Sequence, residues 1–464
     1  MGLQTEMAAI AEAPDQFPVE VETLVIGAGA AGMIAALAAN EAGESVLVLE
    51  RGKTPSGSTA LSAGLIPAAG TRFQSVLGIT DDADLFAADI QRKANNENDM
   101  EFVHLLANQS AQTVEWLADQ HGLPFSLVDD FDYPGHSRRR MHGLPSRSGQ
   151  ELVDRLRTAC EASGIDILCE AAATMLFVSH DVIRGVAFSR PDGSEEMIGC
   201  GRLILACNGY GGNADLVKQY MPEIADALWF GHDGNKGDAV GWGEALGARL
   251  QHLGAYQGHG NVAHPHGILI TWATMTEGGI QVNNRGERFW DESRGYSEAA
   301  RAVLAQPDGE ACAIFDSGIA DIARQFSDFR NAEAQGAIKS GNTPAELANA
   351  LGLPADILGD TLAAIPVGGT DRFGRTFGEQ RLSPPYLGVK VTGALFHTQG
   401  GLVVGHDARV LKADGSPFPN LFATGGAAVG VSGAGDSGYL SGNGLLGAVV
   451  LGKIAGQANK SNAC

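Results

Sequence analysis

The spacing of apolar and polar positions is most regular in the segment 21–50. Val21–Ile26 is an apolar run rich in β-branched residues, and Val46–Leu49 is a second, shorter apolar run. Runs of this length and composition predict buried strands. The alanine-rich stretch between them follows the glycine-rich turn Gly27–Gly32 and predicts a helix. The segment therefore predicts a βαβ unit of the kind that binds a dinucleotide.

Each glycine of this turn has a physical role in such a unit. Gly27 permits a tight turn, Gly29 lets the backbone approach a pyrophosphate, and Gly32 lets the helix pack closely on the strand. The helix N-terminus directs partial positive charge toward the phosphates. Glu50 follows Gly32 by 18 residues, where a carboxylate can accept a hydrogen bond from a ribose hydroxyl. Strand, turn, helix, second strand and acid occur in register, so we expect a bound dinucleotide.

The pattern changes several times along the rest of the chain. Residues 81–121 and 149–164 have helical spacing, and 182–198 has the pattern of a hairpin. The segment 256–381 differs, with mixed charge, short helical pieces and weaker strand signals, and strands return from Gly393. These changes predict four parts: a flexible tail at 1–17, the first part of the cofactor domain at 18–255, an inserted capping or substrate domain at 256–381, and the second part of the cofactor domain at 382–464.

Composition and charge narrow the class of partner. Apolar residues make up 44% of the chain, and no apolar run reaches the roughly 18 residues that a membrane helix needs. The net charge of −22 argues against nucleic acid and anionic membranes as partners. The cysteines are scattered without a Cys-x-x-Cys pair, and the N-terminus lacks the pattern of a signal or transit peptide. We therefore expect a cytoplasmic protein without a membrane span or a metal site.

Eight motifs in order resemble one known family. They are GAGAAG, GSTALSAGLIPAAGT, RMHGLPSRSGQELVDRL, LILACNGYGGN, GGIQVNNRGERFWDE, FHTQGGLVV, NLFATGG and GYLSGNGLLGAVVLGKIAG, and they cover roughly residues 20–460. The chain resembles the flavoprotein-subunit family of fumarate reductases and succinate dehydrogenases, which includes urocanate reductases and 3-ketosteroid Δ1-dehydrogenases. The resemblance implies an α/β fold: a Rossmann-type FAD-binding domain in discontinuous segments, with an inserted α+β capping domain that closes over the substrate.

The resemblance also implies which residues contact FAD. They are Gly27, Gly29, Ala30, Ala31, Gly32, Glu50, Arg51, Ser58, Thr59, Ala60, Ser62, Ala63, Gly64, Ala173, Ala206, Asn208, Gly209, Gly425, Gly426, Asn443, Gly444, Leu445 and Leu446. The helix entered at Gly442–Leu445 would direct its amide-rich end at the charge of reduced flavin. Some relatives carry a flavin-linked histidine near the position of Ser58–Thr59. No histidine stands there, so we expect non-covalent FAD.

Three candidate catalytic residues follow from the same resemblance. His397 stands in the motif HTQGG, whose histidine binds a substrate carboxylate or carbonyl in fumarate-type members. His259 falls where the family has a substrate histidine, although His264 and His266 are close enough to compete for that assignment. Arg294 lies five residues before an alanine pair that follows the catalytic arginine of the reductases. It is a candidate for substrate binding or proton transfer.

The sequence departs from the reductase pattern at the residues that bind a dicarboxylate and move protons. Tyr439 stands where the reductases have a second substrate arginine, and a tyrosine cannot make the bidentate ion pair that holds a carboxylate. Trp272 and Met275 stand where the reductases have a glutamate and an arginine that relay protons. Neither of these side chains can carry a proton. These departures count against fumarate reduction.

The tyrosines resemble those of the 3-ketosteroid Δ1-dehydrogenases. In that group one tyrosine near the C-terminal loop polarises the substrate ketone, and another acts as base; Tyr439 and Tyr296 are similar to these two. As a base, Tyr296 needs a nearby cation because its ordinary pKa is about 10. Arg294 is two residues away in the sequence. Tyr133, in the sequence Tyr-Pro-Gly, is a third candidate for the substrate pocket.

Three functional hypotheses remain open on the sequence alone. The first is FAD-dependent α,β-dehydrogenation of a carbonyl compound, favoured as a cyclic ketone, with hydride transfer to flavin N5. The second is an enoate reductase of the fumarate or urocanate type, with Arg294 as acid and His397 as carboxylate ligand. The third is a non-catalytic flavin-binding electron-transfer subunit. The first two predict a small-molecule carbonyl or enoate substrate and an external electron acceptor or donor.

Overall fold

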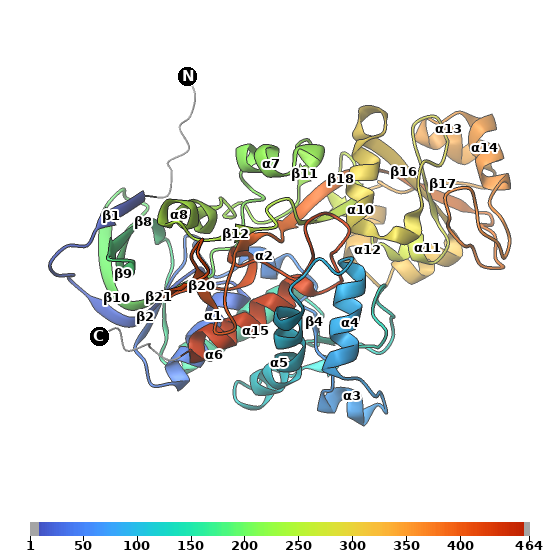
Figure 1. The fold of residues 1–464 in the computed structure, drawn as a ribbon. Helices are drawn as coiled ribbons and strands as arrows, with labels where there is room; N and C mark the ends of the chain where they lie inside the picture. Colours follow the sequence, from blue (N-terminus) through green and yellow to red (C-terminus); the bar gives the residue numbers. More distant parts are fainter. Residues whose placement is uncertain (1–8, 459–464) are drawn as a thin grey trace, which may run out of the picture. The chain divides into compact units, whose positions relative to one another are not determined.

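The computed structural model describes residues 9–458 of the chain (Figure 1). The chain divides into two compact units. The first unit is made of Met1–Tyr220, Gly231–Tyr256 and His397–Cys464. The inserted unit is made of Met221–Phe230 and Gln257–Phe396. The expected fold class is confirmed, because a Rossmann-type α/β domain is built from separated segments of the chain and an α+β domain is inserted between them in the sequence.

A nine-stranded sheet forms the centre of the first unit. Its main path runs in the order β1-β8-β9-β10-β2-β3-β7, and β21 pairs with both β10 and β20. The strands are β1 (Ala9–Glu12), β2 (Glu20–Ile26), β3 (Val46–Leu49), β7 (Asp166–Leu168), β8 (Ala172–Ser179), β9 (Val182–Ser189), β10 (Glu195–Leu205), β20 (Arg409–Leu411) and β21 (Pro417–Ala423). Strand β10 is parallel to β2 and β21 and antiparallel to β9, so segments far apart in the sequence meet on it.

Helices cover this sheet, and smaller strands complete the first unit. The helices are α1 (Ala30–Glu41), α2 (Gly57–Ala60), α3 (Arg72–Val76), α4 (Ala83–Lys93), α5 (Met100–Asp119), α6 (Gly149–Ala162), α7 (Ala214–Tyr220), α8 (Asp238–Leu246) and α15 (Asn443–Gln457). The small strands are β4 (Ile66–Pro67), β5 (Ser126–Leu127), β6 (Met141–Gly143), β12 (Leu250–Gln251) and β19 (Gly401–Leu402). Asp82, Asp99 and Ser148 cap α4, α5 and α6, which lie in the segments where the sequence has helical spacing.

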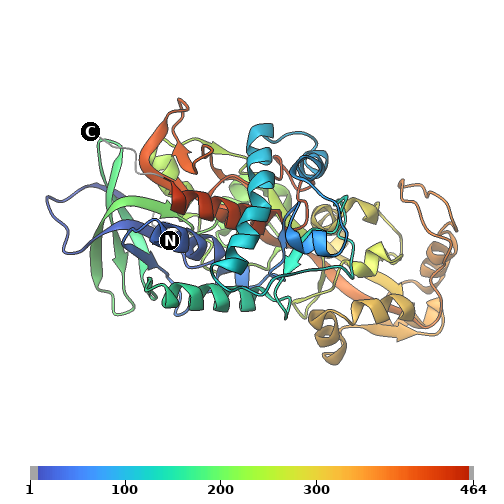
Figure 2. The same cartoon turned by 90° about the horizontal axis from the view of Figure 1, so that it is seen from below.

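Helices α1 and α15 pack side by side, as Figures 1 and 2 both show. Glycines make this close approach possible, because a Cβ atom on Gly456 would stand 2.3 Å from the carbonyl oxygen of Ala35. The buried guanidinium of Arg202, on β10, donates to the carbonyl oxygens of Ala455 and Gly456 at 3.0 and 2.7 Å. The end of the last helix is therefore held by both the first helix and the central strand.

The inserted unit has its own seven-stranded sheet and its own core. Strand β18 (Tyr386–Thr398) is its longest strand and pairs antiparallel with β16 (Glu310–Asp316). The other strands are β11 (Leu228–Trp229), β13 (Tyr256–Ala263), β14 (Ile268–Leu269), β15 (Ile280–Val282) and β17 (Lys339–Gly341). The helices are α9 (Ala273–Thr276), α10 (Tyr296–Leu304), α11 (Ser317–Ala323), α12 (Ser327–Ala334), α13 (Pro344–Leu351) and α14 (Ala355–Ala363).

Four buried charged side chains stabilise the inserted unit around Glu292. Its carboxylate accepts from Arg375 at 2.9 Å and from Arg288, and it also accepts from the backbone N–H of Gln281 at 2.9 Å. Arg288 is also paired with Asp371. The side chains of Glu292, Arg288, Arg375 and Asp371 are all buried. Buried charges of this kind are stable only as a complete set.

Two boundaries differ from those suggested by the sequence. The inserted unit ends at Phe396 rather than at residue 381, because β18 forms its hydrogen bonds with β16 and β17 of that unit. A second short piece, Met221–Phe230, also belongs to it, because β11 pairs with β18. A pattern of apolar residues predicts that a strand exists, but it does not say which sheet the strand joins.

The prediction of a flexible tail at 1–17 is wrong for residues 9–17. Residues 1–8 lie outside the described residues. Ala9–Glu12 forms β1, which pairs in parallel with β8. The ring of Phe17 packs edge-on against Phe177, with centroids 5.6 Å apart. Gly185 and Gly199 leave room for that ring, since a Cβ atom on either would stand 2.5 or 2.8 Å from it. Strand pairing and the packing of Phe17 therefore hold residues 9–17 against the first unit.

Candidate functional site

The turn between β2 and α1 has the shape that a pyrophosphate needs. Gly27 has a φ of 105°, and a Cβ atom there would stand 2.5 Å from the carbonyl oxygen of Ala206. A Cβ atom on Gly32 would stand 1.8 Å from the carbonyl oxygen of Gly27. Gly29 is different, because its Cβ would meet only the hydroxyl oxygen of Thr59, at 3.6 Å. Two glycines are thus required by packing, and the third leaves space at the start of α1 for a phosphate.

Glu50 is held beside this turn by both of its carboxylate oxygens. Oε2 accepts from the backbone N–H of Ala28 at 2.8 Å, and Oε1 accepts from that of Gly52 at 2.7 Å. The side chain is buried. Each carboxylate oxygen has a further lone pair, so Glu50 can still accept from a ribose hydroxyl.

Ser58 and Thr59 present hydroxyl groups near the same helix. Thr59 Oγ1 accepts from the backbone N–H of Ala30 at 3.2 Å. Ser58 Oγ accepts from the side-chain amides of Asn208 and Asn235 at 2.8 and 2.9 Å. The hydroxyl hydrogen of Ser58 remains to donate to a ligand.

Asn235 and Asp238 are two residues of this region that the sequence did not reveal. Asp238 forms an ion pair with the predicted cofactor residue Arg51 and stands at the start of α8. No motif in this stretch carried the family resemblance. The signal that could have located them is the glycine turn Gly234–Gly237, which leads into α8.

Several other predicted FAD residues form tight backbone corners in the first unit. A Cβ atom on Gly209 would stand 1.8 Å from Thr398 Oγ1, and one on Gly426 would stand 2.0 Å from Asn208 Oδ1. Gly425 has a φ of 59° and lies against Ala31. Ala60 ends α2, Ala173 lies in β8, and Ala206 follows β10.

The loop after α2 and the start of α15 hold the remaining predicted FAD positions. Ser62 Oγ donates to the carbonyl oxygen of Thr59 at 2.7 Å and accepts from the N–H of Gly64 at 3.0 Å, so the turn through Ala63 is closed. Leu445 and Leu446 are buried in the first turn of α15. These contacts support the loop and the helix that would flank the flavin.

Asn443 provides a specific test of whether a cofactor fits. Its Nδ2 donates to the carbonyl oxygen of Val431 at 3.2 Å and to Ser432 Oγ at 3.3 Å. Its Oδ1 is buried and has no hydrogen-bond partner among residues 9–458. A buried acceptor without a donor is costly, so it points to a missing partner. Together with the open turn at Gly29, the carboxylate of Glu50 and the hydroxyl of Ser58, it fits a bound FAD.

His397 and Tyr439 converge at the start of α15. Their rings are 5.4 Å apart, in an edge-on arrangement. His397 Nε2 lies 3.2 Å, and the Tyr439 hydroxyl oxygen 3.6 Å, from the point where a Cβ atom on Gly444 would stand. Gly444 leaves the space between them free of side-chain atoms. The structure therefore brings together two of the five predicted catalytic residues as a pair of neighbouring polar groups.

Both members of this pair are uncharged at neutral pH. Desolvation lowers the pKa of His397 to about 4. Burial raises the pKa of Tyr439 to about 12, although hydrogen bonds from the backbone N–H groups of Gly442 and Gly444 act in the opposite direction. A neutral tyrosine hydroxyl is both a hydrogen-bond donor and an acceptor.

The other predicted catalytic residues lie in the inserted unit, beside a column of aromatic rings. His259 stacks between Tyr296 and Phe396, with ring centroids 5.1 and 5.4 Å away and interplanar angles of 16° and 19°. Phe230 continues the column with a stacked contact of 4.9 Å to Phe396. Trp272 meets His259 edge-on at 5.7 Å. His259 is therefore packed among aromatic rings within the inserted unit.

His259 is held as a neutral ring. Its Nδ1 accepts from the backbone N–H of Asn261 at 3.2 Å, which leaves Nε2 as the donor. Burial lowers the pKa of His259 to about 3. His264, the competing candidate, instead pairs with Glu310 at 3.2 Å and is exposed.

Arg294 and Tyr296 flank a special backbone position. Arg294 ends a short 3₁₀ helix (Glu292–Arg294), and Tyr296 is the first residue of α10. Between them Gly295 has a φ of 130°, which is accessible to glycine. Arg294 is exposed and Tyr296 is half-buried. Arg294 and Tyr296 are therefore two residues apart, on either side of the residue that caps α10.

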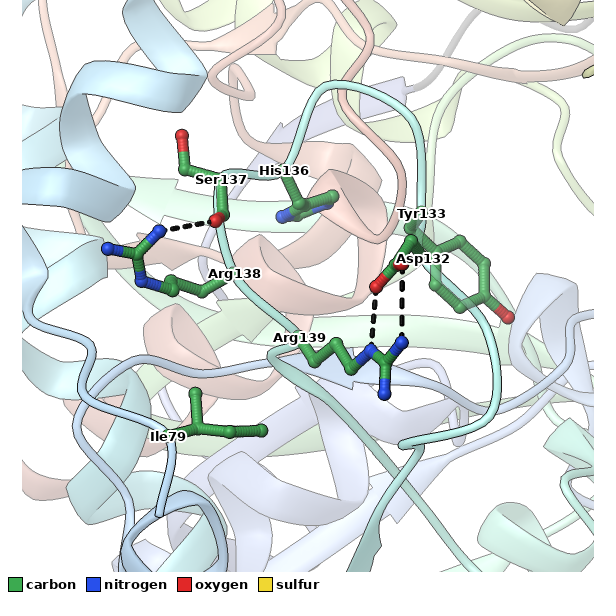
Figure 3. Close-up of a pocket in the computed structure, with 7 residues that line it drawn as sticks. All are labelled: Ile79, Asp132, Tyr133, His136, Ser137, Arg138 and Arg139. Carbon is green, nitrogen blue, oxygen red and sulfur yellow. Dashed lines mark hydrogen bonds and ion pairs between the residues drawn. The ribbon is translucent and has the colours of Figure 1, made fainter. Parts of the chain in front are cut away.

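Tyr133 lines a cavity of about 430 Å³ in the first unit (Figure 3). Its walls also include Asp132, which pairs with Arg139 at 2.6 Å. Burial raises the pKa of Tyr133 to about 12. His136 Nε2 lies 2.9 Å from the carbonyl oxygen of Ser441, which ties this loop to the segment that carries Tyr439. A pocket role for Tyr133 remains a prediction.

Residues 9–458 offer no sign of a metal centre or of a membrane helix. This part of the chain holds no group of three or more histidine, cysteine, aspartate or glutamate side chains that could bind a metal ion. None of its helices is both long and apolar enough to cross a membrane. Its cysteines are free thiols.

Comparison with known proteins identifies the relatives of this chain. A family model described as "FAD binding domain" matches residues 22–445. A probable fumarate reductase, Ifc3, of Shewanella frigidimarina (strain NCIMB 400) is 32% identical over 459 residues, which are 97% of this chain and 76% of the relative.

Two solved structures extend the comparison. The open conformation of a flavocytochrome c3 fumarate reductase is similar with a TM-score of 0.82 and 30% identity, over 95% of this chain and 78% of that one. The 3-ketosteroid-Δ4-(5α)-dehydrogenase of Rhodococcus jostii RHA1 has a TM-score of 0.77 at 23% identity, over 97% of this chain and 99% of that one. The second likeness concerns the fold alone.

Proposed function

Because this chain belongs to the FAD-binding domain family of the fumarate reductases and is an FAD-dependent oxidoreductase of CH–CH groups, we propose that it desaturates a cyclic ketone next to its carbonyl. The observation that carries the proposal is the pairing of two uncharged donors, His397 and Tyr439, beside Gly444. Two neutral donors suit the single oxygen of a ketone. They do not supply the positive charge that a dicarboxylate needs.

Each side chain has a defined task in this reaction. The hydroxyl of Tyr439 and the Nε2–H of His397 donate to the ketone oxygen, which polarises the carbonyl and makes the proton on the α-carbon more acidic. Tyr296 is the candidate base that accepts that proton. FAD, which Gly29, Glu50 and Ser58 would help to hold, would supply the hydride acceptor for the hydrogen on the β-carbon. The product is the α,β-unsaturated ketone.

The surroundings of the candidate residues agree with an apolar cyclic substrate. Phe230, Phe396, Trp272 and Tyr296 surround His259 with aromatic surface. Trp272 and Met275 are buried, and neither can relay a proton to a reduced product. A ring system gains binding energy from burial against such surfaces.

A second candidate function is reduction of an enoate. It is supported by the identity of 32% to a relative named as a probable fumarate reductase, and by the exposed Arg294 as a possible acid. In that case Arg294→Lys would abolish activity while the flavin spectrum stays normal. Under the ketone hypothesis Arg294 is neither the acid nor a carboxylate ligand, so the same change would lower the rate less.

The proposal is tested by anaerobic mixing of the oxidised enzyme with cyclohexanone and with a saturated 3-ketosteroid. We expect at least one of these ketones to bleach the flavin absorbance, because hydride transfer reduces FAD. If neither ketone bleaches the flavin, and fumarate or urocanate reoxidises the reduced enzyme, the enoate hypothesis replaces the ketone hypothesis.

The FAD is expected to be held without a covalent bond. Ser58 and Thr59 use their side chains in hydrogen bonds, and neither is a residue to which flavin is linked in the histidine-linked relatives. Heating the holoenzyme and filtering it should therefore release yellow FAD into the filtrate. Flavin colour that stays with the precipitated protein would contradict this.

We also propose a separate electron acceptor for the reduced enzyme, and a cytoplasmic location. If the isolated chain turns over a ketone or an enoate with an artificial electron acceptor or donor, this chain itself is the catalyst. A chain that binds FAD but does not turn over any ketone or enoate would instead favour the electron-transfer subunit.

A further inference from the structure

Gln399 connects His397 to a chain of polar groups in the first unit. Its Nε2 lies 2.8 Å from His397 Nδ1, and its Oε1 accepts from Ser432 Oγ at 2.7 Å. Ser432 Oγ in turn accepts from Asn443 Nδ2 at 3.3 Å. Gln399, Ser432 and Asn443 are all buried. The four side chains form one continuous set of hydrogen bonds that ends at the imidazole ring.

The surroundings decide which end of the Gln399 amide faces the ring. The atom nearest His397 also lies 3.4 Å from the carbonyl oxygen of Thr398. An amide nitrogen can donate to both acceptors, whereas an amide oxygen would face another oxygen there. The other end faces the hydroxyl of Ser432, which donates to the amide oxygen while it accepts from Asn443. The amide nitrogen therefore faces His397 Nδ1.

We propose that Gln399, oriented by Ser432, is a positioning residue that keeps the proton of His397 on Nε2. A donor aimed at Nδ1 requires a lone pair on that nitrogen, so the single proton of the neutral ring resides on the other nitrogen. Nε2 is the atom that lies beside Tyr439 at Gly444. The side chain of Gln399 touches the imidazole and acts on the substrate only through it.

A second acceptor near His397 would favour the other tautomer if Gln399 were absent. His397 Nδ1 also lies 3.3 Å from the carbonyl oxygen of Thr398. Without the donor from Gln399, that carbonyl would favour a proton on Nδ1. Nε2 would then present a lone pair where the proposed function needs a hydrogen. The two tautomers therefore differ in whether Nε2 carries a hydrogen that can be donated to a ketone oxygen.

The test is the tautomer of His397 in the substrate-free holoenzyme, read from long-range ¹H–¹⁵N correlation spectra at pH 7 and assigned with His397→Gln. We expect the Nε2–H form in the wild type and the Nδ1–H form in Gln399→Met, which keeps a similar volume but removes the donor. Gln399→Glu is a second variant: its carboxylate should place a proton on Nδ1 and raise the pH at which His397 titrates. Gln150→Met is the matched control, because the amide of Gln150 donates to Asp154 on the surface.

An unchanged tautomer in both Gln399 variants, or an Nδ1–H form in the wild type, would overturn the inference. The role in activity rests on the proposed function and is measured separately, as the rate of flavin bleaching by cyclohexanone and by a saturated 3-ketosteroid. We expect Gln399→Met to lower that rate by about 100-fold, as for loss of one transition-state donor. A switched tautomer with an unchanged rate would support the role of Gln399 and count against His397 as a substrate donor.

Discussion

Replacement of Tyr439 by phenylalanine is expected to lower kcat/KM for ketone desaturation by about 100-fold or more, while FAD stays bound. The change removes one hydroxyl group and keeps the ring that packs edge-on against His397. The remaining donor, His397 Nε2–H, polarises the carbonyl less strongly alone. The measurement is the rate of anaerobic flavin bleaching at several ketone concentrations, with the flavin-to-protein ratio recorded for each preparation.

Tyr220→Phe is the matched control for this change. Its hydroxyl donates to Glu244 at 2.7 Å in the same unit, and Tyr220 is neither a candidate catalytic residue nor a candidate FAD ligand. We expect its kcat/KM to stay close to that of the wild type. A fall of only a few-fold in Tyr439→Phe, with enoate reduction preserved, would instead favour the enoate hypothesis.

The second large effect concerns stability rather than activity. Glu292→Gln should lower the free energy of unfolding of the inserted unit by about 3 kcal/mol or more. The change removes the negative charge that faces the buried guanidinium groups of Arg288 and Arg375. Arg288 keeps the carboxylate of Asp371, but Arg375 keeps only neutral groups, among them the backbone carbonyls of Gly279 and Met275 and the ring of Phe377. Tryptophan fluorescence during urea unfolding follows both units, because Trp229, Trp272 and Trp290 lie in the inserted unit and Trp116 and Trp242 in the first. Flavin release follows the first unit, so a fluorescence change that precedes flavin release marks unfolding of the inserted unit.

Glu333→Gln removes a carboxylate of the same kind from a partly exposed pair with Arg324. Its expected cost is about 1 kcal/mol or less, because solvent screens exposed ion pairs. Equal shifts in the urea midpoints of the two variants would show that the network around Glu292 contributes no more than a surface pair. A change in the urea concentration of flavin release, without a change in the unfolding of the inserted unit, would contradict the prediction.

The first βαβ unit could be predicted almost completely from the sequence because its determinants are local. All its parts lie within residues 20–50: β2, the glycine turn, α1, β3 and Glu50. The turn has glycine where the packing permits no Cβ atom. The family resemblance then supplied FAD and the inserted domain. Both are confirmed by the match to the FAD-binding family and by the fold.

What the sequence missed depends on contacts between distant segments. The end of the inserted unit is set by the pairing of β18 with β16, and β1 is placed by β8. Asn235 reaches Ser58 across 177 positions of the chain. Gln399 was visible in the motif that holds His397, but its function depends on Ser432, which comes from another loop. Residue type shows which chemical groups a side chain carries, whereas the fold determines which other residues those groups contact.

The placement of α15 has a consequence for the making of the protein on the ribosome. β10 is synthesised long before β21 and α15, and the whole inserted unit is synthesised between them. Until α15 emerges, α1 lacks its neighbour, and Arg202 lacks the carbonyl groups of Ala455 and Gly456. The nascent first unit therefore exposes an apolar face during much of its synthesis, which is a situation that chaperones relieve. The inserted unit has its own sheet and core, so it can fold before the C-terminal segment of the first unit has been synthesised.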